Sequence, residues 1–247
     1  MPAAVVILAA GRGSRLAGDV PKWFLRPGGR TIAEVQLDGL RRGAAHWTRL
    51  LVVTGFRPEL FDADALGVEL VHNRDWATRN NWYTLAVALE HLAREGWNGA
   101  VCVLNSDLLI GPEVVARFLE AAEADPRSLL AVDPGAPATD EQMKVAVRDE
   151  RVVDIGKGEL SAPPAGEYVG LAKIGAGDVP TLAAILDGFA ADPAHADEWY
   201  EGAFREAMHA GVEFGVFPVD SGRWIEIVDD ADLERAAAIA TLLEDES

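Results

Sequence analysis

Apolar runs with the length of buried strands alternate with amphipathic helical patterns over the first 133 residues. Residues 3–9 form the clearest run, because every position is apolar and the central ones are β-branched. Helices are expected where apolar residues recur every three or four positions. Strands and helices that alternate at this spacing predict a mostly parallel sheet covered by helices, an α/β fold of the Rossmann type. The predicted order is strand 3–9, helix 31–43, strand 50–54, strand 66–71, helix 80–94, strand 100–104, helix 112–124 and strand 128–133.

The pattern changes after residue 133. A stretch rich in proline and glycine leads to a predicted hairpin, with strands at 143–147 and 152–155. A strand at 168–174 follows, and these segments together predict a small β-rich lobe on a mixed sheet. We expect one domain over residues 1–247, with two halves that meet at about residue 133. The remaining predicted elements are helices 179–189 and 197–210, strands 212–219 and 224–227, and helix 230–243.

The first predicted strand runs directly into a loop that combines glycines with cations. Residues 11–15 read Gly-Arg-Gly-Ser-Arg, and Lys22 follows Pro21 at the end of the loop. Glycines after a buried strand let backbone N–H groups approach an anion, while arginine and lysine supply positive charge for phosphate. The spacing is neither the dinucleotide motif GxGxxG nor the P-loop GxxxxGK[ST]. On the glycines alone, a solvent-exposed turn would be the simpler explanation.

The complete string from Val5 to Lys22 resembles the LAAGxGxRL…PK signature of nucleotidyltransferases of the MobA-like and sugar-phosphate nucleotidyltransferase superfamily. This resemblance implies a GT-A-type fold and a nucleoside triphosphate held by the loop, with Arg15 and Lys22 as catalytic residues. It also implies a nucleotide-binding half over residues 1–133, and an acceptor-binding lobe with a closing strand and helix over residues 134–247. The implied nucleotide-binding residues are Leu8, Ala9, Ala10, Gly11, Arg12, Gly13, Ser14, Arg15, Lys22, Gly55, Asn80, Asn81 and Ser106.

Later motifs resemble one branch of that superfamily, the phosphocholine cytidylyltransferases. The branch has an N…NNxxSL element, which is similar to Asn73 followed by the string Asn-Asn-Trp-Tyr-Thr-Leu at residues 80–85. Further matches lie at residues 143–145, 155–157, 167–170 and 224–227. The resemblance implies CTP as the nucleotide and a small acceptor that carries a phosphate or phosphonate group. The implied acceptor-binding residues are Trp82, Tyr83, Lys144, Lys157, Glu167 and Tyr168.

One aspartate follows the predicted strand at 100–104, where the loops of a parallel sheet form a crevice. A carboxylate there is a natural ligand for Mg²⁺, although Asp107 could equally cap a turn. The resemblance implies the metal role, with Glu226 as the second ligand. The usual closing motif, WxEIDxxxDL, is broken, because Val228 stands where the family has aspartate. Neighbouring side chains of a strand point to opposite faces, so Asp229 is only the second choice as a replacement ligand.

Composition indicates a protein that acts on small molecules. The formal net charge is −18, which argues against nucleic acid or an anionic membrane as the main partner. Cys102 is the single cysteine, Met1-Pro2 leads straight into the first strand, and no apolar run approaches the ~20 residues of a membrane span. We therefore expect a cytoplasmic location and no nucleic-acid or membrane partner, and a homodimer is compatible with the resemblance.

The expected reaction is the Mg²⁺-dependent transfer of CMP from CTP to the acceptor, with release of pyrophosphate. Two alternatives stay open: a sugar-1-phosphate nucleotidyltransferase that uses UTP, GTP or dTTP, and a non-catalytic nucleotide-binding regulator, which the missing aspartate would allow. The sequence does not identify the acceptor, because aromatic residues could enclose a quaternary ammonium and acidic residues could bind an amine. The aromatic candidates are Trp23, Trp76, Trp82, Tyr83, Trp199 and Tyr200, and the acidic candidates are Asp140, Glu141, Glu167 and Glu198.

Overall fold

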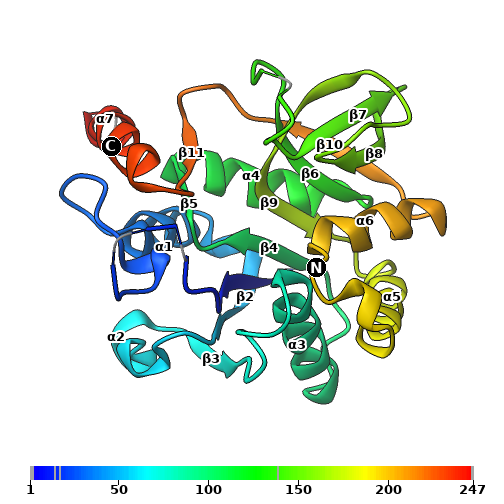
Figure 1. Cartoon of the computed structure of the whole chain (residues 1–247), viewed down its shortest axis with the longest axis horizontal. Helices are drawn as coiled ribbons and strands as arrows, with labels where there is room; N and C mark the ends of the chain where they lie inside the picture. Colours follow the sequence, from blue (N-terminus) through cyan, green and yellow to red (C-terminus); the bar gives the residue numbers. More distant parts are fainter. Residues whose placement is uncertain (1–2, 14, 17, 138, 246–247) are drawn as a thin grey trace.

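A mixed sheet of nine strands forms the centre of the computed structural model, which describes residues 3–13, 15–16, 18–137 and 139–245 (Figure 1). The strand order is β3-β2-β1-β4-β9-β6-β10-β8-β7. Parallel pairs join β1 (Ala3–Ala9) to β2 (Trp47–Thr54) and to β4 (Val101–Asn105), and β2 to β3 (Glu69–His72). The predicted α/β, Rossmann-like class is confirmed.

The long strand β9 (Pro164–Ile174) connects this parallel half to the rest of the sheet. It runs antiparallel to β4 on one side and to β6 (Ser128–Asp133) on the other. Beyond β6, β10 (Phe214–Pro218) pairs parallel with β6 and antiparallel with β8 (Arg151–Gly156). The expected hairpin joins β8 to β7 (Lys144–Arg148), which also pairs with β9. The sheet therefore continues without a break between the strands before and after residue 133.

Helices cover both faces of the sheet, because successive side chains of the central strands point in opposite directions and both sets are apolar. In β1, Val5 and Ile7 belong to the core of one face, and Val6 belongs to the core of the other. The helices of the first face are α1 (Ile32–Arg42), α4 (Pro112–Ala124) and α7 (Asp230–Asp245), and those of the second are α3 (Asn81–Arg94), α5 (Val179–Ala191) and α6 (Tyr200–His209).

Several predicted element starts differ in the structure: β2 begins at Trp47 rather than residue 50, β9 at Pro164 rather than 168 and β10 at Phe214 rather than 212. Leu66 ends the short helix α2 (Ala63–Leu66), whose N-cap Asp62 accepts two backbone hydrogen bonds, so the predicted strand at 66–71 begins too early. Helix α6 begins at Tyr200 because Trp199 before it is extended. Short 3-10 helices, which the sequence pattern does not reveal, lie at Lys22–Phe24, Ala44–His46, Pro58–Leu60 and Pro193–His195.

A second sheet of two strands lies beside the large one. The strand β5 (Leu108–Ile110) falls in a segment predicted as a loop, and it pairs antiparallel with β11 (Trp224–Glu226). In this ladder Glu226 stands opposite Leu108, and the Ile227 N–H donates to the Asp107 carbonyl at 2.9 Å. The pairing places the start of β5 next to the end of β11.

Asp133, at the end of β6, anchors the segment that leads into β11. Its carboxylate is only 3% exposed. It accepts hydrogen bonds from Ser221 Oγ at 2.8 Å, from Trp224 Nε1 at 2.9 Å and from the Gly135 N–H at 2.8 Å. These bonds supply the donors that a buried carboxylate needs, and they fix β11 against the large sheet.

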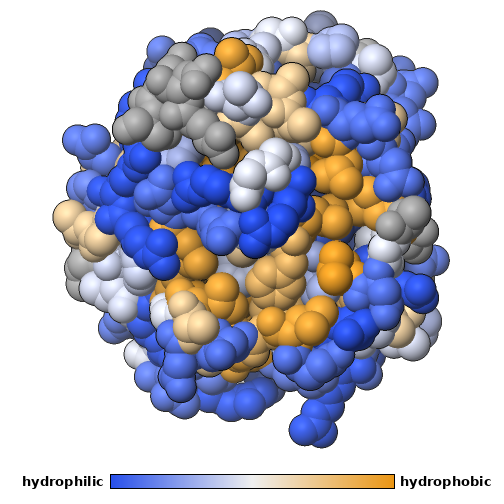
Figure 2. Space-filling model, turned by 90° about the vertical axis from the view of Figure 1, so that its left-hand side faces the viewer, coloured by the Kyte–Doolittle hydropathy of each residue, from blue (hydrophilic) through white to orange (hydrophobic). Residues whose placement is uncertain are grey.

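The molecular surface carries both polar and apolar areas. Figure 2 shows the side on the left of Figure 1, where apolar residues gather in the middle of the face among hydrophilic ones. Among the helices of the described residues, none combines the length and the hydropathy that are needed to cross a bilayer.

Replacing Asp133 with alanine is expected to lower the free energy of unfolding by about 2–4 kcal/mol. The reason is that three donors would lose a charged acceptor in a buried place. Chemical denaturation followed by tryptophan fluorescence measures the change. Asp220→Ala, which removes an exposed carboxylate from the same connection, serves as the control. Equal stability of the two variants would contradict the anchoring role.

Candidate active site

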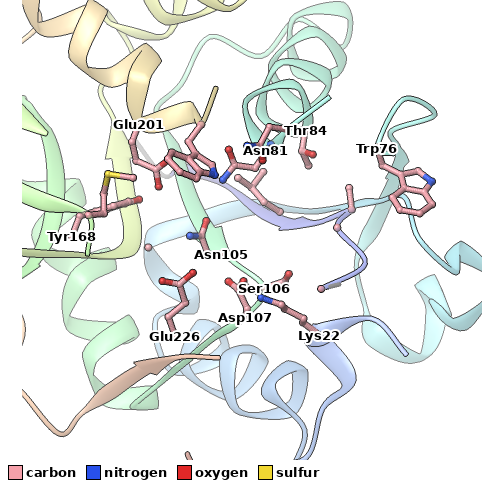
Figure 3. Close-up of a pocket in the computed structure, with 18 of the residues that line it drawn as sticks. Lys22, Trp76, Asn81, Thr84, Asn105, Ser106, Asp107, Tyr168, Glu201 and Glu226 are labelled. Carbon is pink, nitrogen blue, oxygen red and sulfur yellow. Dashed lines mark hydrogen bonds and ion pairs between the residues drawn. The ribbon is translucent and has the colours of Figure 1, made fainter. Parts of the chain in front are cut away.

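A polar cleft with a volume of about 280 Å³ lies at the carboxyl ends of β1 and β4 (Figure 3). Residues of α3, β9, α6 and β11 complete its walls, as expected for a ligand site outside the ends of parallel strands. Most of the residues that the sequence pointed to lie on its walls: Leu8, Ala10, Gly11, Gly13, Lys22, Asn80, Asn81, Ser106, Asp107, Lys157, Tyr168 and Glu226.

The glycine loop after β1 controls the path of the Lys22 side chain. Gly13 has a positive φ of 67°, which favours glycine. A Cβ atom at this position would lie 2.7 Å from Cε and 2.8 Å from Cγ of Lys22, so only glycine lets the lysine stem pass beneath the loop. Lys22 Nζ then reaches Asp107, to which it donates a hydrogen bond at 2.9 Å. The loop and the lysine thus form one packed unit.

Two carboxylates meet on the floor of the cleft. Figure 3 shows Asp107 and Glu226 side by side, with Lys22 next to Asp107. Glu226 is surrounded by protein but keeps access to solvent through the open cleft. The pKa of Glu226 is raised to about 7, chiefly by burial and also by the Asp107 charge, while Lys22 and Lys157 oppose the shift. A cation placed between the two carboxylates would relieve this repulsion.

These residues fit a Mg²⁺ ion. Mg²⁺ prefers oxygen ligands and is usually held by one or two carboxylates while it keeps several waters. Within residues 3–13, 15–16, 18–137 and 139–245, no group of three or more His, Cys, Asp or Glu side chains could enclose a metal. Asp229 does not line the cleft, since its Oδ1 accepts a hydrogen bond from the Asp232 N–H at the start of α7. It is therefore not a replacement ligand in this structure.

Asn80 and Asn81 join two helices that border the cleft. Asn80 caps α3 by accepting from the Asn81 N–H, and its Nδ2 donates to the Asp197 carbonyl at 2.9 Å. Asn81 Oδ1 accepts from the Tyr200 N–H at 3.0 Å, at the start of α6. The two asparagines thereby hold α3 against α6 and fix one wall. Their expected contact with the nucleotide stays a prediction.

Lys157 lies at the other end of the cleft, over the ring of Trp199. Its Nζ is 4.6 Å from the ring centroid, within the range of a cation–π interaction. The loop that carries Lys157 is tied down by the buried Asp154, which accepts from Ser161 N–H and from Arg205 Nε, both at 2.6 Å. Hydrogen bonds from Arg205 and Ser161 keep the pKa of Asp154 below its usual value against the effect of burial.

Two further glutamates carry perturbed pKa values at this end. Burial raises the pKa of Glu167 to about 7, with a further contribution from Glu226. Burial also raises the pKa of Glu201, at the start of α6, to about 8. Glu167 accepts a hydrogen bond from Gln142 at 2.7 Å, but no described residue donates to Oε2 of Glu201. Clusters of carboxylates with shifted pKa values are typical of functional sites.

Two buried tyrosines orient Asn105 at the base of the cleft. Tyr200 Oη donates to Asn105 Oδ1 at 2.9 Å, and Tyr168 Oη lies 3.0 Å from Tyr200 Oη. Burial raises the pKa of both phenols well above the ordinary value, so both remain neutral hydrogen-bonding groups. Because Tyr200 supplies the donor to Oδ1, the Asn105 amide is held in one orientation.

The structure corrects the expected acceptor contacts of Trp82 and Tyr83. Trp82 is 1% exposed and packs edge-on against Phe189 of α5, because its position on α3 faces the core. Tyr83 does not line the cleft either, and the Arg79 guanidinium covers its ring at 4.4 Å. The motif therefore lies on a helix that borders the cleft, α3, but the side chains of Trp82 and Tyr83 do not lie on the side of this helix that faces the cleft.

Several other expected site residues lie beside the cleft without lining it. Ala9 is buried in β1, and Gly55 lies against both Trp76 and the Ala10 carbonyl, which a Cβ atom on Gly55 would approach to 2.6 and 2.7 Å. Arg12 and Arg15 are exposed, so their triphosphate contacts stay predictions. Ser14 lies outside the described residues. Two more expected site residues, Lys144 and Glu167, also do not line the cleft. Lys144 pairs with Asp140 at 3.5 Å in an adjoining hollow.

Four polar lining residues were not among the predicted site residues: Arg79, Thr84, Asn105 and Glu201. Asn105 directly precedes Ser106 and Asp107, so its place after a buried strand was a usable signal. Glu201 carries no such signal, because a single glutamate in an amphipathic helix reads as a solvent-exposed residue.

Comparisons with known proteins agree with this geometry. Residues 5–152 match the family model described as "MobA-like NTP transferase domain". The chain is 35% identical over 147 residues to a 2-C-methyl-D-erythritol 4-phosphate cytidylyltransferase of Cereibacter sphaeroides, an alignment that covers 57% of this chain and 60% of that protein. The chain thus spans about three fifths of the length of this relative.

Solved structures support the fold over almost the whole chain. The CTP:phosphocholine cytidylyltransferase of Streptococcus pneumoniae superposes with a TM-score of 0.78 at 21% identity, covering 97% of this chain and all of that one. The inositol-1-phosphate CTP transferase of T. maritima gives a TM-score of 0.75 at 21% identity, with 98% and 96% covered. At such identities the likeness concerns the fold. Together with the family match, it shows that this chain belongs to the MobA-like NTP transferase family.

Proposed function

We propose that the protein is a cytidylyltransferase that transfers CMP from CTP to a small acceptor bearing a phosphate or phosphonate group. The observation that carries this proposal is the meeting of Lys22, Asp107 and Glu226 beneath a glycine loop in one cleft. The choice of CTP is supported by the similarity to cytidylyltransferases.

The reaction needs positioning more than proton transfer. An anionic oxygen of the acceptor attacks the α-phosphorus of CTP and forms a P–O bond, while the bond between the α-phosphorus and the bridging oxygen breaks. Pyrophosphate leaves with the electron pair, and no general base is required because the nucleophile is already ionised. Lys22 would neutralise charge on the α-phosphate, and the amides around Gly11 and Gly13 would face the triphosphate.

Asp107 and Glu226 are the residues that would hold Mg²⁺. Bound there, the ion would supply positive charge at the phosphates during the displacement. The Lys22 Nζ that now pairs with Asp107 would then be available to the nucleotide. The high pKa of Glu226 agrees with a ligand that ionises fully only beside a cation.

A substrate panel tests the proposal. Purified protein is incubated with Mg²⁺, each of the four nucleoside triphosphates and a set of phosphate- and phosphonate-bearing acceptors, and pyrophosphate release is measured. We expect release with CTP. Turnover of a sugar 1-phosphate with UTP, GTP or dTTP would assign the protein to the sugar-phosphate enzymes instead. Nucleotide binding without turnover of any pair would indicate a regulator.

Lys22→Ala is expected to lower kcat by ~10² or more, because one preorganised charge at the reacting phosphate is lost. The thermal unfolding midpoint should change little, since the ion pair is partly open to solvent. Steady-state kinetics with the substrates found by the panel measure the effect. Arg41→Ala, which removes an exposed cation from α1, is the control. Near-normal turnover of Lys22→Ala would remove the lysine from the catalytic residues.

Asp107→Asn and Glu226→Gln are each expected to weaken Mg²⁺ binding, because a neutral amide replaces one of two carboxylate ligands. The Mg²⁺ concentration for half-maximal activity, or calorimetry with CTP present, measures the affinity. Asp229→Asn removes a nearby carboxylate that faces away from the cleft and should leave the affinity unchanged. A larger effect of Asp229→Asn than of Glu226→Gln would overturn the ligand assignment.

A further inference from the structure

Glu201 is a buried carboxylate with an unused acceptor that faces the cleft. The residue is 6% exposed, lines the cleft, and points into it from the start of α6 (Figure 3). Its buried Oε2 accepts no hydrogen bond from a described residue, although Tyr200 lies near enough to the carboxyl group to oppose the rise of its pKa. A buried polar atom without a partner costs stability, so such an atom in a ligand site indicates a donor supplied by the ligand.

The charges around Glu201 indicate that this donor is cationic. Three carboxylates, those of Glu167, Glu201 and Glu226, lie close enough to affect one another, because Glu226 raises the pKa of both others. Lys157 is the one lysine that acts on all three. Burial raises the pKa of Glu201 to about 8, so its carboxyl group is largely neutral near pH 7; an ammonium ion beside Oε2 would let it ionise, which a neutral polyol would not.

The aromatic residues of this region are poorly arranged for a quaternary ammonium. The ring of Trp199 already faces Lys157 Nζ at 4.6 Å, and the ring of Tyr83 faces Arg79 at 4.4 Å. Of the other candidate aromatics, Trp23, Trp82 and Tyr200 are fully buried in the core. Trp76 lines the cleft, but it lies across it from Glu201 (Figure 3) and its ring packs against Phe56 at 5.5 Å. An ammonium ion that keeps its N–H bonds can instead bind Glu201 directly.

We infer that the acceptor carries an ammonium group with at least one N–H, which donates to Oε2 of Glu201 while the phosphate or phosphonate end faces Asp107 and Glu226. The inference rests on the proposed function and narrows its acceptor to aminoalkyl phosphates or phosphonates. Glu201 would contact the acceptor away from the reacting atoms, so its role is to select which acceptor binds and not to take part in the chemical step.

The test compares acceptors that differ only at nitrogen. Phosphoethanolamine, its N-methyl and N,N-dimethyl derivatives and phosphocholine all carry one positive charge, but only phosphocholine lacks an N–H. We expect kcat/KM to fall ~10- to 100-fold at the last methylation step, because a charge-assisted hydrogen bond is lost there. Glycerol 3-phosphate, which has hydroxyl donors and no cation, should be as poor as phosphocholine. Equal use of phosphocholine and phosphoethanolamine with CTP would overturn the inference and leave the proposed function intact.

Glu201→Gln should raise the KM for phosphoethanolamine ~10- to 100-fold with a smaller change in kcat, since binding rather than chemistry is affected. Its kcat/KM for glycerol 3-phosphate should stay nearly constant. Glu206→Gln, which makes the same change at a glutamate of α6 whose side chain is 56% exposed, is the matched control. An unchanged KM in a folded Glu201→Gln would reject the assignment.

A binding measurement separates the two proposals. If no triphosphate and acceptor release pyrophosphate, the proposed function fails, and calorimetry of phosphoethanolamine with the wild-type protein then decides the ammonium site by itself. Binding that Glu201→Gln loses and Glu206→Gln retains would support the site. No binding to the wild-type protein would overturn it.

Thermal unfolding checks the unpaired state of Glu201 without any substrate. The ionisable groups that face it are Tyr168, Tyr200, Glu226 and Lys157. Its pKa is about 8 in the folded protein against an ordinary 4.5, so folding takes up a proton between these values and stability falls as pH rises through this window. Glu201→Gln should therefore raise Tm more at pH 8 than at about pH 5.5. An equal shift at both pH values would show that the carboxylate has a partner.

Discussion

The pairing of β5 with β11 is the constraint on which the site depends. Asp107 directly precedes β5 and Glu226 ends β11, so the short antiparallel ladder is what brings two distant parts of the chain to one place. Bringing two carboxylates together is unfavourable, and the structure offsets it with Lys22 beside Asp107 and with a raised pKa at Glu226. Asp133 holds the start of β11, while Asp232 accepts from the Val228 and Asp229 N–H groups just after its end.

The two ends of the cleft differ in charge. Lys22 and the glycine loop lie beside Asp107 at one end, whereas the buried Glu201 lies at the other, where Lys157 acts on it, in a chain with a net charge of −18. An asymmetric field of this kind can orient a ligand that is anionic at one end and cationic at the other before any close contact forms. The Asn80 and Asn81 bonds hold the start of α6, which carries Glu201, against α3.

Local patterns revealed the parallel half of the fold and the glycine loop, because strand β1 and this loop are continuous in sequence. Most other cleft residues came from the resemblance to nucleotidyltransferases. β5 was not predicted, because a run of only three apolar residues next to a helix is too short to show the periodicity of a strand. Trp82 was misplaced because a motif names positions without showing which side of a helix faces the core. Glu201 could not be predicted as a site residue, because its burial, raised pKa and unpaired oxygen arise only when α6 packs against β9 and α3.

The contact between Gly13 and the stem of Lys22 also limits how this sequence can change. A side chain at position 13 would lie under 3 Å from Cε and Cγ of Lys22, so any residue larger than glycine there requires the lysine stem to move. A substitution at position 13 would therefore displace the Lys22 side chain and disturb its ion pair with Asp107, although the two positions are separated in the chain. Glycine at position 13 is thus required by packing against Lys22 as well as by its positive φ.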